Sequence, residues 1–436
     1  MKNFFIYLFC LTAILSVSSC MDKYSEELSL NTPVYLDYET LRSSVKQTTS
    51  RDLMRPGKIG FKDQYLFVVE YREGIHVIDV SNPSNPQNKV FIEVPGCVDI
   101  ALKDNVLYAD SYVDLVAIDL SDINHPKEKN RLKDVLPYTV PIAENENLPY
   151  TQVEKEKGVV VAWETMREKH GLERRYYPHP QYPLYADYAY NKLDAGGYFG
   201  LASSNGGASG GIGASFGKSG SMARFGLFDK YLYVVDNNML YMFDVDNADI
   251  PVKSGSQYLN GSVETIFVYD NHLFFGTPTG MLVYSLSVPN TPVYVQSFSH
   301  ITACDPVVVQ DGYAYVTLRA GTDCRNTSVN RLDIIKCSDD YKQLDLINSY
   351  DMTQPYGLGI DDNILFLCDG NAGLKIYDAT VKEQIRMLTS FPDIQTYDVI
   401  PAGGYLFMIG NDGFYLYDYS NIYNIRILGH IPVVKK

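Results

Sequence analysis

The segment GGIGASFGKSGS, residues 210–221, ends in the Gly-Lys-Ser triplet that also ends a nucleotide-binding P-loop. A P-loop has glycine, four residues and then this triplet, with a strand before it and a helix after it. Here the first-glycine position is Ile212, and the flanking residues indicate neither a strand nor a helix. Ten of the positions from Ala195 to Gly220 are glycine, so the triplet needs no functional explanation. We predict no nucleotide site, and a flexible, surface-running segment, with order against the propeller face as the alternative.

A second candidate is the acidic segment DVDNADIP, residues 244–251, whose spacing partly matches a calcium-binding loop. An EF-hand loop has glycine at its sixth position and glutamate at its twelfth. Here these positions are Asp249 and Gly255, so we expect a turn and no metal. Glu164, Glu168 and His170 lack the HExxH zinc spacing, and we assign no catalytic residue and no cofactor.

The N-terminus has the features of an export signal. Lys2 is followed by the apolar run FFIYLFCLTAIL, which is too short for a membrane anchor, and then by the small residues of VSSC, Val17–Cys20. This stretch resembles the lipobox of bacterial lipoproteins. The resemblance implies a signal peptide over residues 1–19 and lipid attachment at Cys20, and an ordinary secretory signal is the alternative. Either signal places the protein outside the cytoplasm, where disulfides form.

Charge and composition narrow the class of partner. The formal net charge of −15 disfavours nucleic acids and anionic lipid surfaces as partners. Nucleotides are also scarce outside the cytoplasm. The chain is 46% hydrophobic, as in folded proteins, and it has 36 tyrosines against a single tryptophan. Tyrosine is common in strands and on half-exposed surfaces, because its ring packs while its hydroxyl contacts water.

An internal repeat organises most of the chain. A turn residue precedes each Tyr/Leu-rich strand, and its positions are Asp63, Asp104, Asp229, Asp270, Asp311, Asp362 and Gly403. The residue numbers of successive turns differ by 41, 125, 41, 41, 51 and 41, so one period recurs along the chain. Each unit reads as four short strands, and prolines follow the third. Such repeats predict an all-β fold, a β-propeller of four-stranded antiparallel blades.

The repeats IHVIDVSNPSNP, LVAIDLSDINHP and MFDVDNADIP, together with the lipobox, resemble the LVIVD-repeat propeller lipoproteins of Gram-negative, Bacteroidetes-type bacteria. We expect residues 20–55 to form a membrane tether and N-terminal segment, with a short helix over 38–49, and residues 56–435 to form the propeller. Seven blades are read directly, although the long interval between Asp104 and Asp229 formally allows eight or nine. We prefer seven blades with one long insertion over residues 137–220, in which only residues 156–166 read as a strand.

The repeat also suggests how the cysteines are arranged. Cys304 opens a first strand, and Cys324 lies in the extended loop after the next strand, so both are expected at the same end of one hairpin. We predict a Cys304–Cys324 disulfide, with Cys368 as the alternative partner. The cysteines lack the CxxC spacing of metal sites.

One column of the repeat is expected to face the mouth of the propeller, because first strands line its axis. Charged and aromatic residues stand where the first strands begin, and could hold an ion or a polar ligand. The candidates are Asp99, Arg224, Glu264, Asp305, Tyr356, Tyr397 and Asp398, with Lys58 in the same column. The alternative is a ring of mutually paired charges that only closes the barrel.

The insertion is the other candidate surface, since RRYYPHPQYPLYADYAYNKLDAGGYFG, residues 174–200, contains seven tyrosines. Tyrosine beside arginine, histidine and aspartate is typical of surfaces that recognise proteins or sugars. The binding candidates are Tyr176, Tyr177, Tyr182 and Tyr185. An insertion that merely covers one face of the ring is equally compatible with the sequence.

We therefore expect a lipid-anchored binding or scaffolding module of the outer membrane, on the periplasmic side or the cell surface. Its partners would be the membrane, through the N-terminal lipid, and a protein or glycan ligand. The alternative is an envelope enzyme that acts on polysaccharide or peptide through acidic residues at the mouth. The fold alone does not decide between them, because propellers host both.

Overall fold

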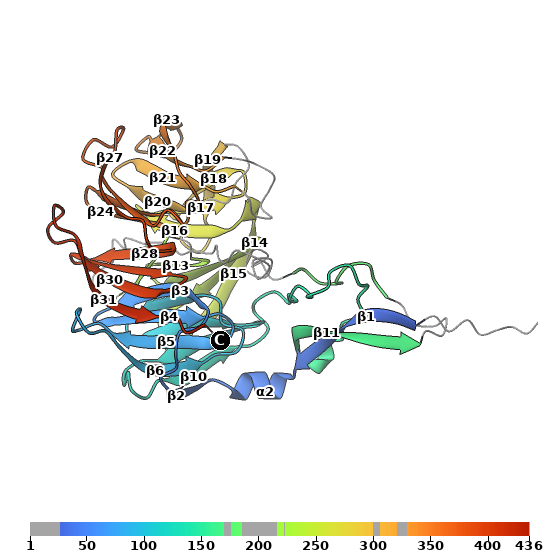
Figure 1. Cartoon of the computed structure of the whole chain (residues 1–436). Helices are drawn as coiled ribbons and strands as arrows, with labels where there is room; N and C mark the ends of the chain where they lie inside the picture. The colour runs from blue at the N-terminus through green and yellow to red at the C-terminus, as the bar shows by residue number, and fades with distance from the viewer. Residues whose placement is uncertain are drawn as a thin grey trace, which may run out of the picture.

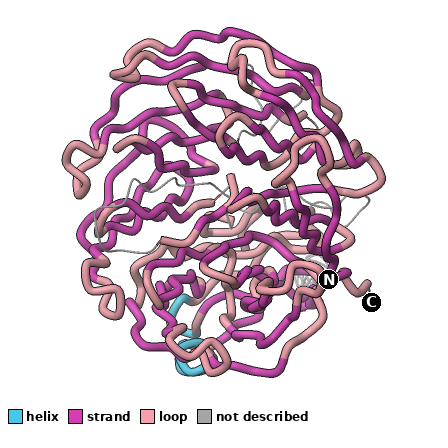
Figure 2. Tube along the Cα trace, turned by 90° about the vertical axis from the view of Figure 1, so that its left-hand side faces the viewer, coloured by secondary structure: helices cyan, strands magenta, loops and turns pink. Residues whose placement is uncertain are grey.

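The structure is a computed structural model that describes residues 27–169, 176–184, 216–221, 223–299, 306–320 and 329–435. Within these ranges, seven antiparallel sheets are arranged as the blades of a β-propeller (Figure 2). The prediction of seven blades is confirmed. Blades 1 to 7 follow the chain, and in each the first strand lies nearest the axis.

Blade 1 comprises β3 (Pro56–Lys62), β4 (Tyr65–Glu70), β5 (Gly74–Asp79) and β6 (Gln87–Glu93). Blade 2 comprises β7 (Ile100–Lys103), β8 (Val106–Ser111), β9 (Asp114–Asp119) and β10 (Lys127–Leu132). Blade 3 comprises β13 (Phe225–Phe228), β14 (Tyr231–Asp244) and β15 (Val252–Val263). In blade 3, the first half of β14 pairs with β13 and the second half with β15. Asn237, between the halves, has a φ of 54°, so β14 occupies both the second and third strand positions.

Blade 4 comprises β16 (Thr265–Tyr269), β17 (His272–Thr277), β18 (Gly280–Ser285) and β19 (Val293–Ser299), and blade 5 comprises β20 (Val307–Gln310), β21 (Tyr313–Leu318), β22 (Arg331–Cys337) and β23 (Leu344–Asp351). Blade 6 comprises β24 (Leu358–Asp361), β25 (Ile364–Cys368), β26 (Leu374–Asp378) and β27 (Arg386–Phe391). Blade 7 comprises β28 (Thr396–Ala402), β29 (Tyr405–Gly410), β30 (Gly413–Asp418) and β31 (Arg426–Pro432). Consecutive strands within each sheet pair as neighbours.

The turn residues that define the repeat have the backbone conformation that this turn needs. Asp63, Asp104 and Asp229 have φ of 57°, 51° and 52°, and Gly403 has φ of 60°. Aspartate tolerates this left-handed region better than most residues, and glycine adopts it freely. The residue that marks each 41-residue repeat in the sequence is therefore the turn residue of the hairpin between the first and second strands.

A second turn repeats after the third strand, and it explains the calcium-like segment. The side chain of Asp244 accepts a hydrogen bond from the main-chain N–H of Asp246, at 2.9 Å. Asp79, Asp119 and Asp418 make the same contact two residues along the chain in their own blades. Aspartate initiates such turns because its carboxylate replaces a main-chain acceptor. Asp244 is therefore a turn residue, as predicted, and the described residues contain no cluster of metal ligands.

An accessory module stands beside the ring, and it is visible to the right of the propeller in Figure 1. It comprises β1 (Glu27–Leu36), α2 (Tyr38–Ser43), the 3-10 helix η1 (Lys155–Lys157) and β11 (Val159–Lys169). β1 pairs with β11 along its whole length. Residues 27–36, within the expected membrane tether and N-terminal segment over residues 20–55, therefore form a paired strand, because the insertion provides them with a partner strand.

The helix is shorter than the predicted span of residues 38–49. Asp37 caps its N-terminus by accepting from the main-chain N–H of Thr40, and the helix ends at Ser43. The chain then forms β2 (Lys46–Thr49), which pairs with β6 as an additional outer strand of blade 1. None of the helices in the described ranges has the length and apolar character that a membrane span requires.

Candidate functional site

We use the name mouth face for the face of the ring where the first strands begin and where the second strands turn into the third. The chain places its own residues in the axis, beginning at the far end of the first strands beside Phe61 and Leu102 and reaching the mouth face at Ser221 and Arg224. β12 (Lys218–Ser219) pairs with β3, the first strand of blade 1, and Gly217 N–H donates to the carbonyl of Leu102 in β7, at 2.8 Å. A Cβ at Gly217 would lie 2.6 Å from Cβ of Leu102, so only glycine permits this approach.

Residues 216–221 together with 223 and 224 are called the axial segment below. Its lysine, Lys218, donates to the carbonyl of Pro401 in blade 7, at 3.2 Å. Ser221 is fully buried, and its hydroxyl accepts from Leu358 N–H of blade 6, at 2.7 Å. The carbonyl of Ala223 accepts from Ile266 N–H of blade 4, at 2.8 Å. The prediction of a flexible, surface-running segment is therefore wrong for residues 216–221, which are ordered in the axis and join several blades, and the residues before 216 lie outside the described ranges.

The described charged residues of the mouth are engaged by the protein itself. Asp99 is 2% exposed, and its carboxylate accepts from the main-chain N–H of Arg224 and lies 3.9 Å from Nζ of Lys58. The guanidinium of Arg224 pairs with Asp236, at 2.9 Å. Asp398 is 1% exposed and accepts from Ser221 N–H, at 3.4 Å. Each of these described charges therefore has a partner inside the protein.

The remaining mouth candidates differ in their surroundings. Tyr356 and Tyr397 are 2% and 4% exposed, and their rings meet edge to face with centroids 5.4 Å apart. Burial raises the pKa of Tyr397 well above its ordinary value. Glu264 is partly exposed, and Asp305 lies outside the described residues.

Asp110 belongs to the same buried network although the sequence did not identify it. Its carboxylate accepts from the main-chain N–H groups of Val98 and Asp99, at 2.8 and 2.9 Å. Burial raises its pKa to about 6, although these two hydrogen bonds and Arg224 act in the opposite direction.

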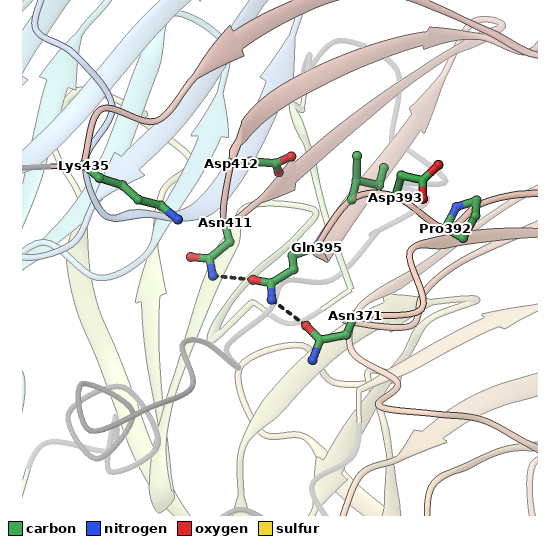
Figure 3. Close-up of a pocket in the computed structure, with 8 residues that line it drawn as sticks. Asn371, Pro392, Asp393, Gln395, Asn411, Asp412 and Lys435 are labelled. Atoms are coloured by element: carbon green, nitrogen blue, oxygen red, sulfur yellow. Dashed lines mark hydrogen bonds between the residues drawn. The ribbon is translucent and has the colours of Figure 1, made fainter.

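The mouth face also carries an open groove of about 470 Å³ over blades 6 and 7 (Figure 3). It is lined by Asn371, Pro392, Asp393, Ile394, Gln395, Asn411, Asp412 and Lys435. Asn411 Nδ2 donates to Gln395 Oε1, and Gln395 Nε2 donates to Asn371 Oδ1, at 2.5 Å. The three amides therefore form one hydrogen-bonded row across the groove. We call this site the amide groove.

Sequence reasoning missed the amide groove. Its residues come from the turn between β25 and β26, the connection from β27 to β28, the turn between β29 and β30, and the C-terminal end. One sequence pattern could have indicated it. When the repeats are aligned, Asn371 and Asn411 occupy the turn between the second and third strands in consecutive repeats.

The tyrosines of the insertion have different environments. Tyr176 is 51% exposed, whereas the main chain of Tyr177 pairs with Tyr150. The ring of Tyr182 packs on Tyr138, and Nζ of Lys155 lies 4.2 Å from its centroid. These contacts give Tyr182 a packing role inside the accessory module. Tyr185 lies outside the described residues.

The cysteine predictions are only partly covered by the structure. Cys304, Cys324 and the lipid-attachment candidate Cys20 lie outside the described residues. Cys368, the alternative partner, is a fully buried free thiol, and burial raises its pKa well above the ordinary value. Cys97 and Cys337 are also buried free thiols. The Cys304–Cys324 disulfide stays a prediction.

Comparison with known proteins supports the repeat. The LVIVD repeat matches residues 58–91 and 97–134, which cover most of blades 1 and 2. The chain therefore contains LVIVD repeats, as its sequence indicates. Among curated proteins, none matches this chain.

Several solved structures are similar at low sequence identity. A computationally designed protein, Ika8, has 10% identity and a TM-score of 0.48, with 89% of this chain and 92% of that chain covered. A provisionally assigned 6-phosphogluconolactonase of Bacteroides fragilis has 9% identity and a TM-score of 0.46, covering 90% and 96%. A protein of Lactobacillus plantarum has 10% identity and a TM-score of 0.43, covering 87% and 97%. These likenesses indicate no activity, and the fold rests on the sheet topology.

Proposed function

We propose that this protein is a lipid-anchored binding or scaffolding module of the bacterial envelope, held at the outer membrane through Cys20. One observation supports binding over catalysis: the axial segment occupies the axis of the ring and bonds to acidic side chains at its mouth. Asp99 and Asp398, two carboxylates that are 2% and 1% exposed at the mouth, accept hydrogen bonds from main-chain N–H groups of the axial segment. A catalytic acid or base must reach its substrate, which these two groups do not.

The mouth face offers two accessible structures for recognition, and both lie on the same side of the ring. The accessory module contacts blade 2 through Tyr112 and Val113, at the turn between β8 and β9. The amide groove contains Asn371 and Asn411, from the equivalent turns of blades 6 and 7. Equivalent turns of a closed ring share one face, so a large ligand could contact both structures.

The anchor is tested by fractionating cells that express the wild type or Cys20→Ser. We expect the wild type in the membrane fraction, with incorporation of labelled fatty acid, and the variant in a soluble extracytoplasmic fraction without label. Equal fractionation of the two chains would contradict the lipid anchor. Protease treatment of intact cells then separates the surface from the periplasmic side.

The binding role is tested by recovering partners from native membranes with the tagged full chain. We expect specific recovery of an envelope protein or glycan that is reduced when Tyr176 and the groove residue Asn371 are both substituted. Hydrolysis of a polysaccharide or peptide by the purified chain, without such a partner, would favour the enzyme alternative.

A peptide map under non-reducing conditions tests the Cys304–Cys324 disulfide, and free thiols at both positions would contradict it.

A further inference from the structure

The amide groove has a defined direction of hydrogen bonding. Asn411 donates to Gln395, which donates in turn to Asn371 (Figure 3). The row therefore leaves an acceptor, Oδ1 of Asn411, at one end and a donor, Nδ2 of Asn371, at the other. Within the part of the chain that the structure describes, neither atom has a hydrogen-bond partner.

The groove ends carry opposite charges. Figure 3 places Lys435 beside Asn411 and Asp393 at the other side of the row. Among the described residues, neither of these two side chains forms an ion pair or a hydrogen bond. Asp412 adds a second carboxylate, one oxygen of which accepts from the hydroxyl of Tyr415, at 2.5 Å. The groove thus offers donors and acceptors in alternation, with a slight excess of negative charge.

The main chain beneath the row is fixed, so the amides are held in position before a ligand arrives. Thr396 N–H donates to the carbonyl of Gly370, at 3.2 Å, and its hydroxyl donates to the carbonyl of Gly373, at 3.0 Å. A Cβ at Gly410 would lie 1.9 Å from the carbonyl oxygen of Gln395, so the strand passes directly against the residue that centres the row. Preorganised groups of this kind bind with a smaller loss of conformational entropy.

This set of groups restricts the class of ligand. A phosphate or other anion would meet one lysine against two carboxylates, and an apolar ligand would find only Pro392 and Ile394. A hydroxyl both donates and accepts, so neighbouring hydroxyls can satisfy the donor, the acceptor and the carboxylate in one pose. The volume of about 470 Å³ lies within the range of about 300 to 1,000 Å³ that is usual for small-ligand sites.

We infer that the amide groove is a binding site for a neutral oligosaccharide, recognised through its vicinal hydroxyls by Asn371, Gln395 and Asn411. The inference deepens the proposed binding function and rests on it, because it names the ligand class of one recognition surface. The sugar hydroxyls accept from Nδ2 of Asn371 and donate to Oδ1 of Asn411, while Gln395 holds both amides in orientation.

The test uses the purified chain without its signal peptide and soluble neutral trisaccharides of glucose, mannose and xylose at millimolar concentration. Saturation-transfer NMR and calorimetry measure binding. Asn371→Asp is the decisive variant, because it keeps the Oδ1 acceptor for Gln395 and replaces the outward donor with a second, negatively charged oxygen that cannot donate. We expect at least one trisaccharide to bind, and Asn371→Asp to weaken it about tenfold, the effect of losing roughly 1.4 kcal/mol.

Two further variants complete the test. Gln395→Leu interrupts the row and should weaken binding at least as much as Asn371→Asp. Asn290→Asp makes the same chemical change in an exposed turn between β18 and β19, on the opposite face, and should leave binding unchanged.

The proposal is overturned by three results: no trisaccharide binds the wild type, binding is unaffected by Asn371→Asp, or triglycine binds the groove in place of the sugars. None of these results decides the proposed function. The membrane fractionation and partner recovery described above test that function separately.

Discussion

At the residue scale, Asp110 is the clearest source of pH-dependent stability. Its pKa is raised from an ordinary value of 3.8 to about 6, chiefly by burial. The folded protein therefore holds this proton more tightly than the unfolded chain does. The stabilisation is complete below about pH 4 and is lost as the pH rises through about 6.

Asp110→Asn tests this assignment, because the amide keeps an acceptor for Val98 and Asp99 N–H without the charge of the partly buried carboxylate. We expect the urea midpoint of the variant, relative to wild type, to increase between about pH 4 and about pH 7. Asp340→Asn is the control with the opposite sign and a lower pH range: hydrogen bonds from Lys342 and Ser338 lower the pKa of this exposed carboxyl to about 2, so its stabilisation is present above about pH 4 and is lost as the pH falls toward 2. A difference for Asp110→Asn that does not vary with pH would contradict the assignment.

Ser221 provides a second residue-scale prediction, because its hydroxyl is the buried acceptor for Leu358 N–H. Ser221→Ala leaves that N–H without a partner, which costs about 1 to 3 kcal/mol in the free energy of unfolding. Ser219→Ala, in the same short segment, is the matched control, since its hydroxyl forms no hydrogen bond within the described residues. Equal unfolding free energies for the two variants, measured in urea, would show that the axial segment does not contribute to stability.

At the scale of elements, the accessory module has its own aromatic core. Trp163 of β11 donates from Nε1 to the carbonyl of Pro141, at 2.6 Å, and its ring meets Tyr150 edge to face. Arg42 of α2 binds the buried carboxylate of Asp114, at 3.0 Å, and connects the module to blade 2. The module therefore has its own core, and it is joined to the ring through Arg42 at blade 2 and through the chain that continues from α2 into β2 at blade 1.

Trp163→Ala should consequently unfold the module and leave the ring intact. Removing a large packed aromatic side chain costs up to about 3 to 5 kcal/mol, more than a module of this size is expected to tolerate. Hydrogen exchange should lose protection in residues 27–36 and 137–169, whereas the blades keep theirs. Met166→Ala, in the same strand but 47% exposed, should change neither region. Loss of protection throughout the blades after Trp163→Ala would contradict a separate module.

The features that could be predicted from the sequence are the turns, because local residue chemistry determines them. Asp104 and Asp119 reveal their turns directly, because both backbone conformation and side-chain hydrogen bonding favour aspartate there. The pairing of β1 with β11 was not predictable from local patterns, since the two strands are far apart in the sequence. The position of Gly217 in the axis was not predictable from the sequence. A glycine that permits close backbone approach looks the same in the sequence as a glycine in a flexible loop. The amide groove was missed for a related reason: its amides come from three separate connections.

At the scale of the whole molecule, one seam of the ring differs from the others. The four successive strands β3–β6 of blade 1 come from the beginning of the ring sequence and those of blade 7 from its end, so no chain connection joins these two blades. The seam is held by the stacked rings of Phe61 and Phe407, with centroids 4.3 Å apart, and by Val434 N–H, which donates to the carbonyl of Leu53 at 2.8 Å. Lys218 of the axial segment adds its contact with Pro401 of blade 7, close to β3 of blade 1.

Phe407→Ala should therefore weaken the ring at the one seam between successive blades that no chain connection spans. We compare it with Phe274→Ala, because Phe274 is equally buried and packs on Tyr341 across the connected seam between blades 4 and 5. Each substitution should lower the free energy of unfolding by about 3 to 5 kcal/mol. Only Phe407→Ala should also increase hydrogen exchange in β3–β6 and β28–β31 under native conditions, because those blades can separate locally while the others stay joined in sequence. If both variants raise exchange evenly around the ring, the seam between blades 7 and 1 opens no more readily than the connected seams, and closure does not depend on this packing.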